Sequence, residues 1–484
     1  MIYTSLEFMI LLALTMAAYF ALPSRRARLW LLIATSFLFY AWAGIFDFGI
    51  FLFVVIASYI SAWLGNRDRA RKKLWVTLGI TVLVAHLFVW KYLPWINHLF
   101  GGRLELPLPV GISFFTLQGI AYLVDFAGSE TGLMSLEEYL LFKSFFAQLI
   151  AGPITRAKQM LPYLRSLPRP TASMAARGAT LFTLGLFKKL IIADHMALLS
   201  DTVFSSPLRF DRATLALASL AFYVQDWGDF SGYTDMGRGA AQLLGIELPR
   251  NFLSPLLAAS PWEWARRWHV TLGLWLRDYL YVPLGRALRR LLGRSGPARI
   301  VRQLVCTAAV LLFAGLWHGA EWNFVLFGVY LGFVFGIGLL LRPFAAALRT
   351  RIGGGPFIVF SVLFGLVTTL IGVVFFRAPS LELTFAYFHA FVAPASDAVS
   401  LAPYAESFVL RIVVAYALEG VLYYRLDTGT FPVVDAFQSR TRAFRHRHPR
   451  LTALVAAIAV ALVFVLSLVY RENDSPTAFI YFRF

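Results

Sequence analysis

The sequence predicts an all-α protein that crosses a membrane many times. Of its 484 residues, 59% are hydrophobic, whereas apolar residues make up about half of a soluble domain. Mean hydropathy is +0.68. The apolar residues come in blocks of about 20, which is the length that a helix needs to cross a bilayer. A transmembrane β-barrel is excluded, because its strands would alternate apolar and polar residues over short segments.

The net charge of +18 comes from short basic clusters between the apolar blocks. The clusters lie at 25–28, 67–73, 156–177, 286–302, 342–351 and 440–450. This distribution follows the positive-inside rule, so we assign all of them to the cytoplasmic side, beside anionic lipid head groups. The basic charge therefore indicates the lipid bilayer as partner, and no nucleic acid.

Hydropathy predicts about 11–12 membrane-spanning helices. We expect them at Met1–Ala21, Leu29–Ala43, Phe48–Leu64, Leu74–Leu93, one within 108–150, Leu181–Asp194, Thr214–Val224, Leu304–Leu316, Phe324–Leu341, Phe357–Phe376, Phe408–Tyr424 and Leu451–Val469. The first block is expected to stay as a span, because its arginines follow it where a signal peptide has basic residues first. The pattern predicts both termini outside the cytoplasm.

We expect one integral-membrane domain over 1–484. N-terminal spans would fill 1–106, a core with the candidate functional residues 107–341, and C-terminal spans 342–484. The single cysteine, Cys306, cannot form an internal disulfide or a Cys-based zinc site. No His-Glu-x-x-His or Gly-x-Ser-x-Gly motif is present, so nothing indicates a metal or a bound cofactor.

Three stretches fit a simple span poorly, namely Pro107–Phe126, Ala147–Arg156 and Tyr223–Gly239. The first contains prolines, glycines and Asp125, the second contains Gly152-Pro153, and the third has four glycines and three aspartates among aromatic residues. Irregular backbone at membrane depth is tolerated only where it is buried in protein or lines a cavity. We therefore expect a cavity within the bundle; the alternative is that these stretches are loops at the head-group level.

His318 lies between two apolar runs, Leu304–Leu316 and Phe324–Leu341. An ionisable side chain at membrane depth is costly and marks a functional site by default. The alternative is an amphipathic ring at the lipid–water boundary. Both runs begin or end at basic clusters assigned to the cytoplasm, so His318 is expected in the outer half of the membrane.

The stretch Ser260–Tyr281 predicts one amphipathic helix lying in the cytoplasmic interface. Ser260 and Glu263 have the spacing of a capping box, with proline at the first helical position. The charged side of the helix carries Glu263, Arg267 and Asp278, with Arg266 and Arg277 beside them and His269 at the margin. These arginines would suit an anionic ligand. Lipid anchoring is the alternative, but it gives His269 no role. Elsewhere, Lys188 and Lys189 are expected to snorkel at a span end.

Seven segments, spread over nearly the whole chain, resemble motifs of the membrane-bound O-acyltransferase family. They are Pro109–Phe115, Asp229–Met236, Arg266–Leu272, Trp275–Gly285, Gly315–Gly319, Val374–Ala378 and Phe479–Phe484. Within the family, the bacterial alginate O-acetyltransferase branch is the nearest likeness. One departure is Gln225–Gly228, where the family has a more apolar, aromatic run.

The resemblance implies a helical bundle around a central tunnel, in the bacterial inner membrane. It places the family's essential histidine at His318 and a second polar position at His269. It also implies transfer of an acyl group from acetyl-CoA, as donor substrate, to an extracellular polysaccharide, with a periplasmic SGNH-type acetyltransferase as partner. Other acceptors (peptidoglycan, teichoic acid, cellulose or a lipid) stay open, and so does a transporter or exporter, although no inverted repeat is visible.

The chemistry expected at His318 is general base catalysis, because neutral imidazole takes up a proton near neutral pH. No nucleophilic serine or cysteine is evident, which favours direct transfer, although an acyl-histidine stays possible. Glu321 is expected to share a helical face with His318 and orient its ring, or else to be an interfacial carboxylate. Trp317 and Asp229 complete the candidate residues. With His269 assigned to the cytoplasmic side and His318 nearer the outside, we expect a tunnel between them.

Overall fold

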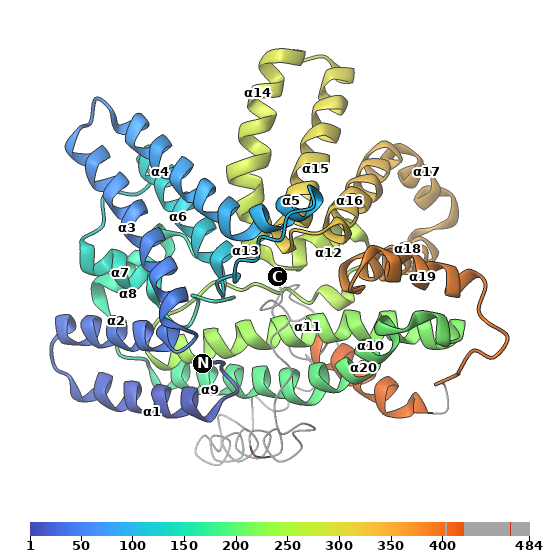
Figure 1. Ribbon diagram of the computed structural model, residues 1–484, viewed down its shortest axis with the longest axis horizontal. Helices are drawn as coiled ribbons and strands as arrows, with labels where there is room; N and C mark the ends of the chain where they lie inside the picture. Colours follow the sequence, from blue (N-terminus) through green and yellow to red (C-terminus); the bar gives the residue numbers. More distant parts are fainter. Residues whose placement is uncertain (402–403, 421–464, 466–484) are drawn as a thin grey trace. The chain divides into compact units, whose positions relative to one another are not determined.

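The structure, a computed structural model, describes residues 1–401, 404–420 and 465. Across the described residues every regular element is a helix, and one isolated bridge joins Phe210 to Val399 (Figure 1). The predicted all-α class is therefore confirmed. The basic cluster at 440–450, the span predicted at Leu451–Val469 and the motif Phe479–Phe484 lie outside the described residues, apart from the single residue 465.

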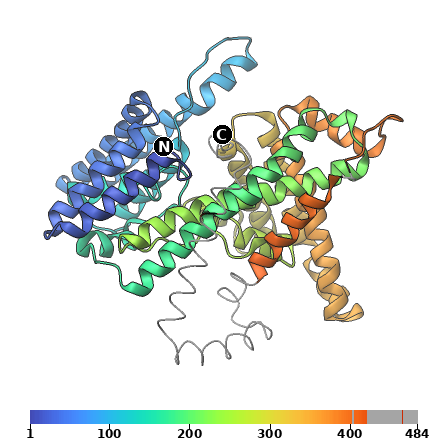
Figure 2. The same ribbon diagram turned by 90° about the horizontal axis from the view of Figure 1, so that it is seen from below.

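The chain forms two compact units, which we call unit 1 and unit 2. Within the described residues, unit 1 consists of Met1–Leu186 and Gly232–Arg250, and unit 2 of Phe187–Ser231 and the residues from Asn251 onward. Helix α11, Arg212–Leu243, which is a long green helix in Figure 2, contributes residues to both units. The single-domain organisation expected from sequence stays a prediction.

Unit 1 contains most of the N-terminal helices. They are α1 (Leu6–Ala21), α2 (Arg25–Ala41), α3 (Ile45–Arg67), α4 (Lys72–Leu87), the π-helical turn η1 (Phe88–Tyr92), α5 (Leu93–Leu99), α6 (Ile112–Ala127), α7 (Leu136–Ser144), α8 (Ala157–Ser166) and α9 (Ala172–Phe187).

Unit 2 contains the remaining elements. They are η2 (Lys188–Ala193), α10 (Asp194–Ser205), η3 (Pro207–Arg209), η4 (Pro255–Leu257), α12 (Pro261–Arg267), α13 (Val270–Leu276), η5 (Arg277–Tyr281), α14 (Val282–Leu292), α15 (Gly296–His318), α16 (Trp322–Leu340), α17 (Arg342–Ile352), α18 (Gly354–Arg377), α19 (Leu381–Val392) and α20 (Glu406–Leu418).

Five stretches in the described residues are long and apolar enough to cross a membrane. They are α3, the run Lys72–Leu99, α15, α16 and α18. Large apolar side chains on them face outward, as lipid-facing residues do; examples are Phe53, Leu78, Val305, Phe333 and Leu363. The protein is therefore a multi-pass membrane protein, whereas the total of about 11–12 spans stays a prediction.

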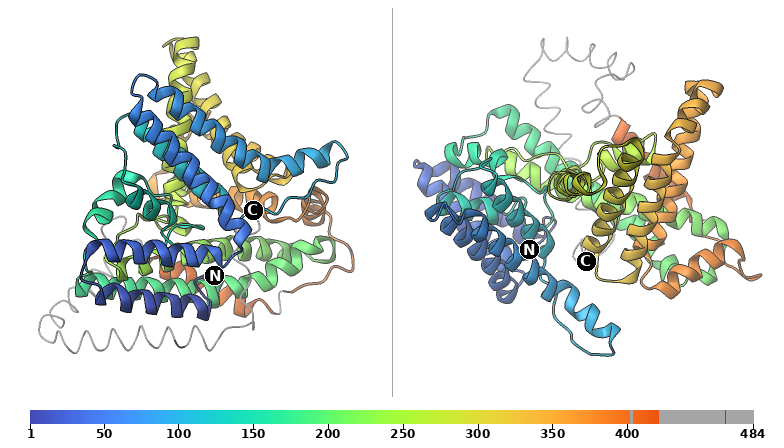
Figure 3. Two further views of the ribbon diagram at one scale, coloured as in Figure 1. Left: turned by 60° about the vertical axis from the view of Figure 1, so that its left-hand side comes forward. Right: turned by 90° about the horizontal axis from the view of Figure 1, so that it is seen from above.

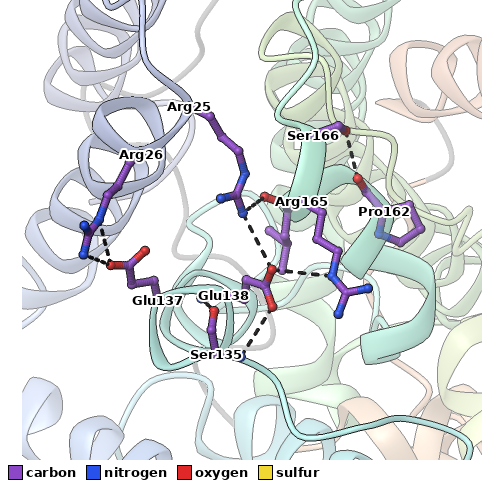
Figure 4. Close-up of polar contacts among 9 residues, drawn as sticks. Arg25, Arg26, Ser135, Glu137, Glu138, Pro162, Arg165 and Ser166 are labelled. Atoms are coloured by element: carbon purple, nitrogen blue, oxygen red, sulfur yellow. Dashed lines mark hydrogen bonds and ion pairs between the residues drawn. The ribbon is translucent and has the colours of Figure 1, made fainter.

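Arginines from two of the basic clusters contact the same acidic pair of α7 in unit 1 (Figure 4). Arg26 at the start of α2 pairs with Glu137 of α7 at 2.6 Å. The neighbouring carboxylate, Glu138, lies 3.6 Å from Arg25 and 3.5 Å from Arg165 of α8. The clusters at 25–28 and 156–177 thus lie together, as the positive-inside pattern predicts, and they bind acidic side chains of the protein itself.

The three stretches expected to be irregular differ in outcome. Ala147–Arg156 is non-helical, as predicted, and Pro107–Phe126 becomes helical from Ile112 onward, after Gly111 with φ +75°. The third prediction is wrong, because Tyr223–Gly239 lies inside α11, a continuous helix of 32 residues. The α11 glycines allow close packing instead of breaking the helix: a Cβ at Gly228 would lie 3.2 Å from the Lys188 carbonyl oxygen.

Candidate functional site

Two antiparallel helical arms of unit 2 form a hairpin (Figures 1 and 3), and the candidate histidines lie at one end of it. The first arm runs without interruption from Val270 to Leu292, through α13, η5 and α14. The second arm is α15, which ends at His318. Since His269 immediately precedes the first arm, both imidazoles lie at the end away from the connecting turn.

Side-chain packing confirms the register of this hairpin. Near its turn, a Cβ at Gly285 would lie 3.7 Å from the Cys306 sulfur. Further along, Trp275 stacks on Phe313 with ring centroids 6.1 Å apart. These pairs fall in antiparallel order, and the next contact in the series joins His269 to Trp317.

The prediction of a single helix over Ser260–Tyr281 is wrong, because the helix is interrupted near the middle of this stretch. Helix α12 ends at Arg267, and His269 has a positive φ of +42°, a left-handed conformation that few non-glycine residues adopt. The predicted cap of α12 is confirmed: the Ser260 hydroxyl accepts a hydrogen bond from the Glu263 amide at 3.2 Å. The Glu263 carboxylate, however, pairs with Arg267 at 2.6 Å.

His269 is held from one side by Asn251. Its Nδ1 lies 3.0 Å from the Asn251 Oδ1, and the amide and hydroxyl of Thr271 donate to the same oxygen at 3.2 and 2.7 Å. A backbone N–H only donates, so it identifies this atom as oxygen. Nδ1 therefore carries the hydrogen and Nε2 is the acceptor nitrogen.

Burial keeps the His269 imidazole neutral. The residue is 3% exposed, and desolvation lowers the pKa of its ring to about 3. The ring is therefore uncharged throughout the physiological pH range.

The Trp317 indole contacts both imidazoles. Its ring centroid lies 5.6 Å from that of His269 and 4.8 Å from that of His318, in edge-to-face arrangements. Phe230 packs on His269 at 4.8 Å, and Phe376 on His318 at 4.9 Å. His318 itself is half-buried. The site is thus two imidazoles set in an aromatic wall.

The expectation that the two histidines lie on opposite sides of the membrane is therefore wrong. It assumed that the stretch around His269 lies flat in the cytoplasmic interface. Instead, the chain turns at His269 and runs antiparallel to α15, so that His269 shares the neighbourhood of His318.

The arginines and Asp278 proposed as ligand-binding residues have different surroundings. Arg266 is exposed. Arg267 donates to the Ser254 carbonyl at 3.2 Å besides its pair with Glu263. Asp278 pairs with its neighbour Arg277 at 2.7 Å. Of these three candidates, Arg266 is the one whose side chain faces outward without a polar contact to the described residues.

Glu321 does not share a helical face with His318, so the predicted geometry is wrong. Helix α15 ends at His318, Gly319 continues in extended conformation, and Glu321 is the N-cap residue of α16. Its side chain is exposed. The spacing of three residues was read as one helical turn, but it crosses a break between two helices.

Lys189 is buried, so the prediction that it snorkels to the surface is wrong. Its Nζ lies 2.9 Å from carboxylate oxygens of both Asp194 and Asp229. The adjacent Lys188 is also buried and donates to the Ser231 hydroxyl at 3.2 Å. Asp229, a candidate from the sequence, thus belongs to a buried charged triad (Lys189, Asp194 and Asp229).

Sequence reasoning missed Asn251 altogether. Asn251 follows Pro249-Arg250, and this proline indicates a loop. Nothing in the local sequence indicates that its side chain bonds His269, eighteen positions later. Among the described residues, no group of three or more His, Cys, Asp or Glu side chains has the arrangement of a metal site.

Comparisons with known proteins identify the family of the chain. The model of the MBOAT, membrane-bound O-acyltransferase family, matches residues 112–375, which include both histidines. A probable alginate O-acetylase of Azotobacter vinelandii is 31% identical over 524 residues, covering all of both chains. A peptidoglycan O-acetyltransferase of Helicobacter pylori is 34% identical over 63% of each chain. A teichoic acid D-alanyltransferase of Streptococcus thermophilus is 26% identical over 60% of this chain and 70% of its own. The chain therefore belongs to the membrane-bound O-acyltransferase family and is an acyltransferase.

Proposed function

We propose that the protein moves an acetyl group from acetyl-CoA, across the bacterial inner membrane, to hydroxyl groups of an extracellular polysaccharide. Alginate is the first candidate acceptor. The observation that carries the chemistry is the pair of imidazoles in contact with one indole at the end of a helical hairpin. The relatives named for alginate support the acceptor, because the similarity to that of Azotobacter vinelandii spans both chains completely.

In this proposal His318 is the general base. Its imidazole takes the proton of the acceptor hydroxyl while the oxygen attacks the thioester carbonyl carbon. The C–S bond breaks as the C–O bond forms, and the thiolate of CoA takes the proton back from the imidazolium, so atoms and charge balance. General base catalysis supplies a factor of about 10²–10⁴, and positioning of the two substrates supplies more.

His269 has a different role in the same site. Because its imidazole stays neutral, it acts as a fixed hydrogen-bond acceptor beside the reacting groups, and Trp317 holds the two rings in place. Arg266, exposed on α12, is the residue that we assign to the phosphates of CoA. Arg267, Asp278 and Glu321 are proposed to shape the donor entrance.

The acceptor is tested separately from the chemistry. Peptidoglycan is a second candidate, because one relative 34% identical to this chain carries that name. Either polymer lies outside the inner membrane, so we propose a tunnel through the bundle and delivery to a periplasmic SGNH-type acetyltransferase. Inner membranes with radiolabelled acetyl-CoA would be offered alginate, peptidoglycan, teichoic acid or cellulose, and esterified label would be counted in each polymer and in lipid.

The residues are tested by substitution in the same assay. His318→Ala is expected to lower transfer at least 100-fold, because the base is lost. The matched control is His389→Ala, which removes an exposed imidazole of α19 in the same unit and is expected to leave transfer unchanged. Folded His318→Ala protein with normal transfer would refute the proposed mechanism. Label that crosses the membrane without forming an ester would indicate a transporter instead.

A further inference from the structure

We propose that Asn251 is a positioning residue, which holds His269 in the tautomer with hydrogen on Nδ1 and so keeps Nε2 as a hydrogen-bond acceptor in the site. The inference rests on the proposed function, since it assigns His269 a part in acyl transfer. It adds a residue that neither the motifs of the sequence nor the family resemblance brought forward.

The hydrogen bonds of Asn251 carry the proposal. Three donors converge on its Oδ1, namely Nδ1 of His269 and the amide and hydroxyl of Thr271. Asn251 is 1% exposed, so water does not compete for this oxygen. With Nδ1 committed as donor, the neutral ring has only Nε2 as an acceptor.

The backbone fixes the same arrangement. The Val270 amide donates to the Asn251 carbonyl at 2.9 Å, and the Leu253 amide donates to the Arg267 carbonyl at 2.9 Å. These two bonds tie the loop that contains Asn251 to both sides of the break at His269. The asparagine therefore cannot shift independently of the imidazole that it holds.

The conformation of His269 points to the same requirement. A positive φ costs free energy for a residue with a Cβ, and glycine or asparagine is the usual choice at such a position. A buried histidine there needs compensation from its surroundings. The hydrogen bond that the His269 Nδ1 donates to Asn251 and the contacts with the rings of Phe230 and Trp317 provide it.

It also matters that the side-chain amide of Asn251 carries no charge. A carboxylate in the same place would also accept from Nδ1, but it would favour the imidazolium and raise the pKa of His269. The imidazole would then lose its acceptor nitrogen whenever it became protonated. Asparagine fixes the tautomer without this pH dependence, so that only His318 changes protonation during transfer.

The first experiment compares three variants by their pH profiles of acetyl transfer. Asn251→Leu removes the acceptor and is expected to lower transfer about 10- to 100-fold at every pH. This is the effect of removing a hydrogen-bond partner that orients a histidine in metal sites, and we expect a similar effect here. Asn251→Asp is expected to approach wild-type transfer at pH 8.5 and to lose it, relative to wild type, as the pH falls to 5.5. Asn323→Leu is the control, because Asn323 is also buried but bonds the Ala378 carbonyl at 2.6 Å.

The control separates positioning from a general loss of stability. Asn323→Leu is expected to keep the pH profile of the wild type even if less folded protein is recovered. A ratio of Asn251→Asp to wild-type activity that does not change with pH would overturn the proposal. Wild-type transfer in folded Asn251→Leu protein would overturn it as well.

The second experiment does not depend on activity. Protein labelled with ¹⁵N in histidine and reconstituted in bilayers would be compared with its His269→Gln variant, so that the missing signals identify the His269 ring. We expect a protonated Nδ1 and an unprotonated Nε2 in the wild type, and a changed tautomer ratio in Asn251→Leu. The opposite tautomer in the wild type would overturn the proposal. If His318→Ala kept full transfer while these spectra were as expected, the proposed function would fail and the tautomer assignment would stand.

Discussion

The buried charged triad formed by Lys189, Asp194 and Asp229 allows a sharp test of how unit 2 is stabilised. The three side chains are 5%, 6% and 3% exposed, and both N···O distances are 2.9 Å. Lys189→Met preserves most of the side-chain volume but removes the ammonium group that lies 2.9 Å from both carboxylates. Removing one partner of a buried ion pair costs about 3–5 kcal/mol, so we expect the free energy of unfolding to fall by that amount.

A second ion pair of the same length provides the control. Lys158 and Glu130 in unit 1 are also 2.9 Å apart, but their side chains are 49% and 56% exposed. Coulomb attraction between exposed groups is screened by water, so Lys158→Met is expected to cost between 0 and about 1 kcal/mol. The two substitutions make the same chemical change at the same N···O distance, but Lys189 is buried between two carboxylates and Lys158 faces one carboxylate at the surface.

The assay is reversible denaturant unfolding in bicelles, with the free energy of unfolding measured for each variant. The triple variant Lys189→Met, Asp194→Asn and Asp229→Asn is expected to recover part of the loss, because the two carboxylates that faced the lost ammonium group are neutralised as well. A cost below 1 kcal/mol for Lys189→Met, or equal costs for both single variants, would refute the reasoning. Either result would mean that water reaches the triad.

Three further predictions concern Gly315 in the hairpin, the buried ring of His269 and the N-terminal cap of α12. Gly315→Ala places a Cβ onto the Phe324 carbonyl and is expected to cost about 1–3 kcal/mol and to reduce acetyl transfer, whereas Gly332→Ala, whose nearest neighbour lies 3.6 Å away, should be tolerated in both assays. Burial lowers the pKa of His269 to about 3, so between pH 6.5 and 3 only the unfolded chain binds the proton, and stability falls as the pH falls. Between pH 7.5 and 5 the wild type should therefore lose about 2 kcal/mol more stability than His269→Gln, and equal losses would show that the ring is not buried. Ser260→Ala removes a cap bond and should cost about 1 kcal/mol in the same unfolding assay, a neutral effect being the contrary result.

Local features of the fold could be predicted from the sequence, because their causes lie within a few residues. The spans follow from long apolar runs, and the cap of α12 follows from the spacing of Ser260, Pro261 and Glu263. The burial of Lys189 could not be predicted in this way. Whether a lysine at a span end snorkels or becomes buried depends on carboxylates that reach it, and one of these, Asp229, is forty positions away on another helix.

The break at His269 was hidden for a different reason. The hydrophobic positions of Ser260–Tyr281 keep a helical period, and Ala265, Arg266 and Arg267 before the break are good helix formers, so the local pattern favours one helix. The left-handed conformation is imposed by Asn251 and by the two backbone bonds around it, which are tertiary contacts. Tertiary structure overrides propensity here at a candidate functional residue, where such departures are expected.

The position of the site follows from the equal lengths of the two hairpin arms. Helix α15 has 23 residues, and the run from Val270 to Leu292 matches it in number, with a turn of Gly293–Ser295 between them. Each residue adds about 1.5 Å to a helix, so arms of equal length must bring their far ends together. Once the helix is known to begin at Val270, the arm lengths and the turn are enough to predict that His269 and His318 lie close together. The error of placing them on opposite sides came entirely from joining α12 to α13, which shows how one backbone angle decides where the chemistry of this membrane protein is assembled.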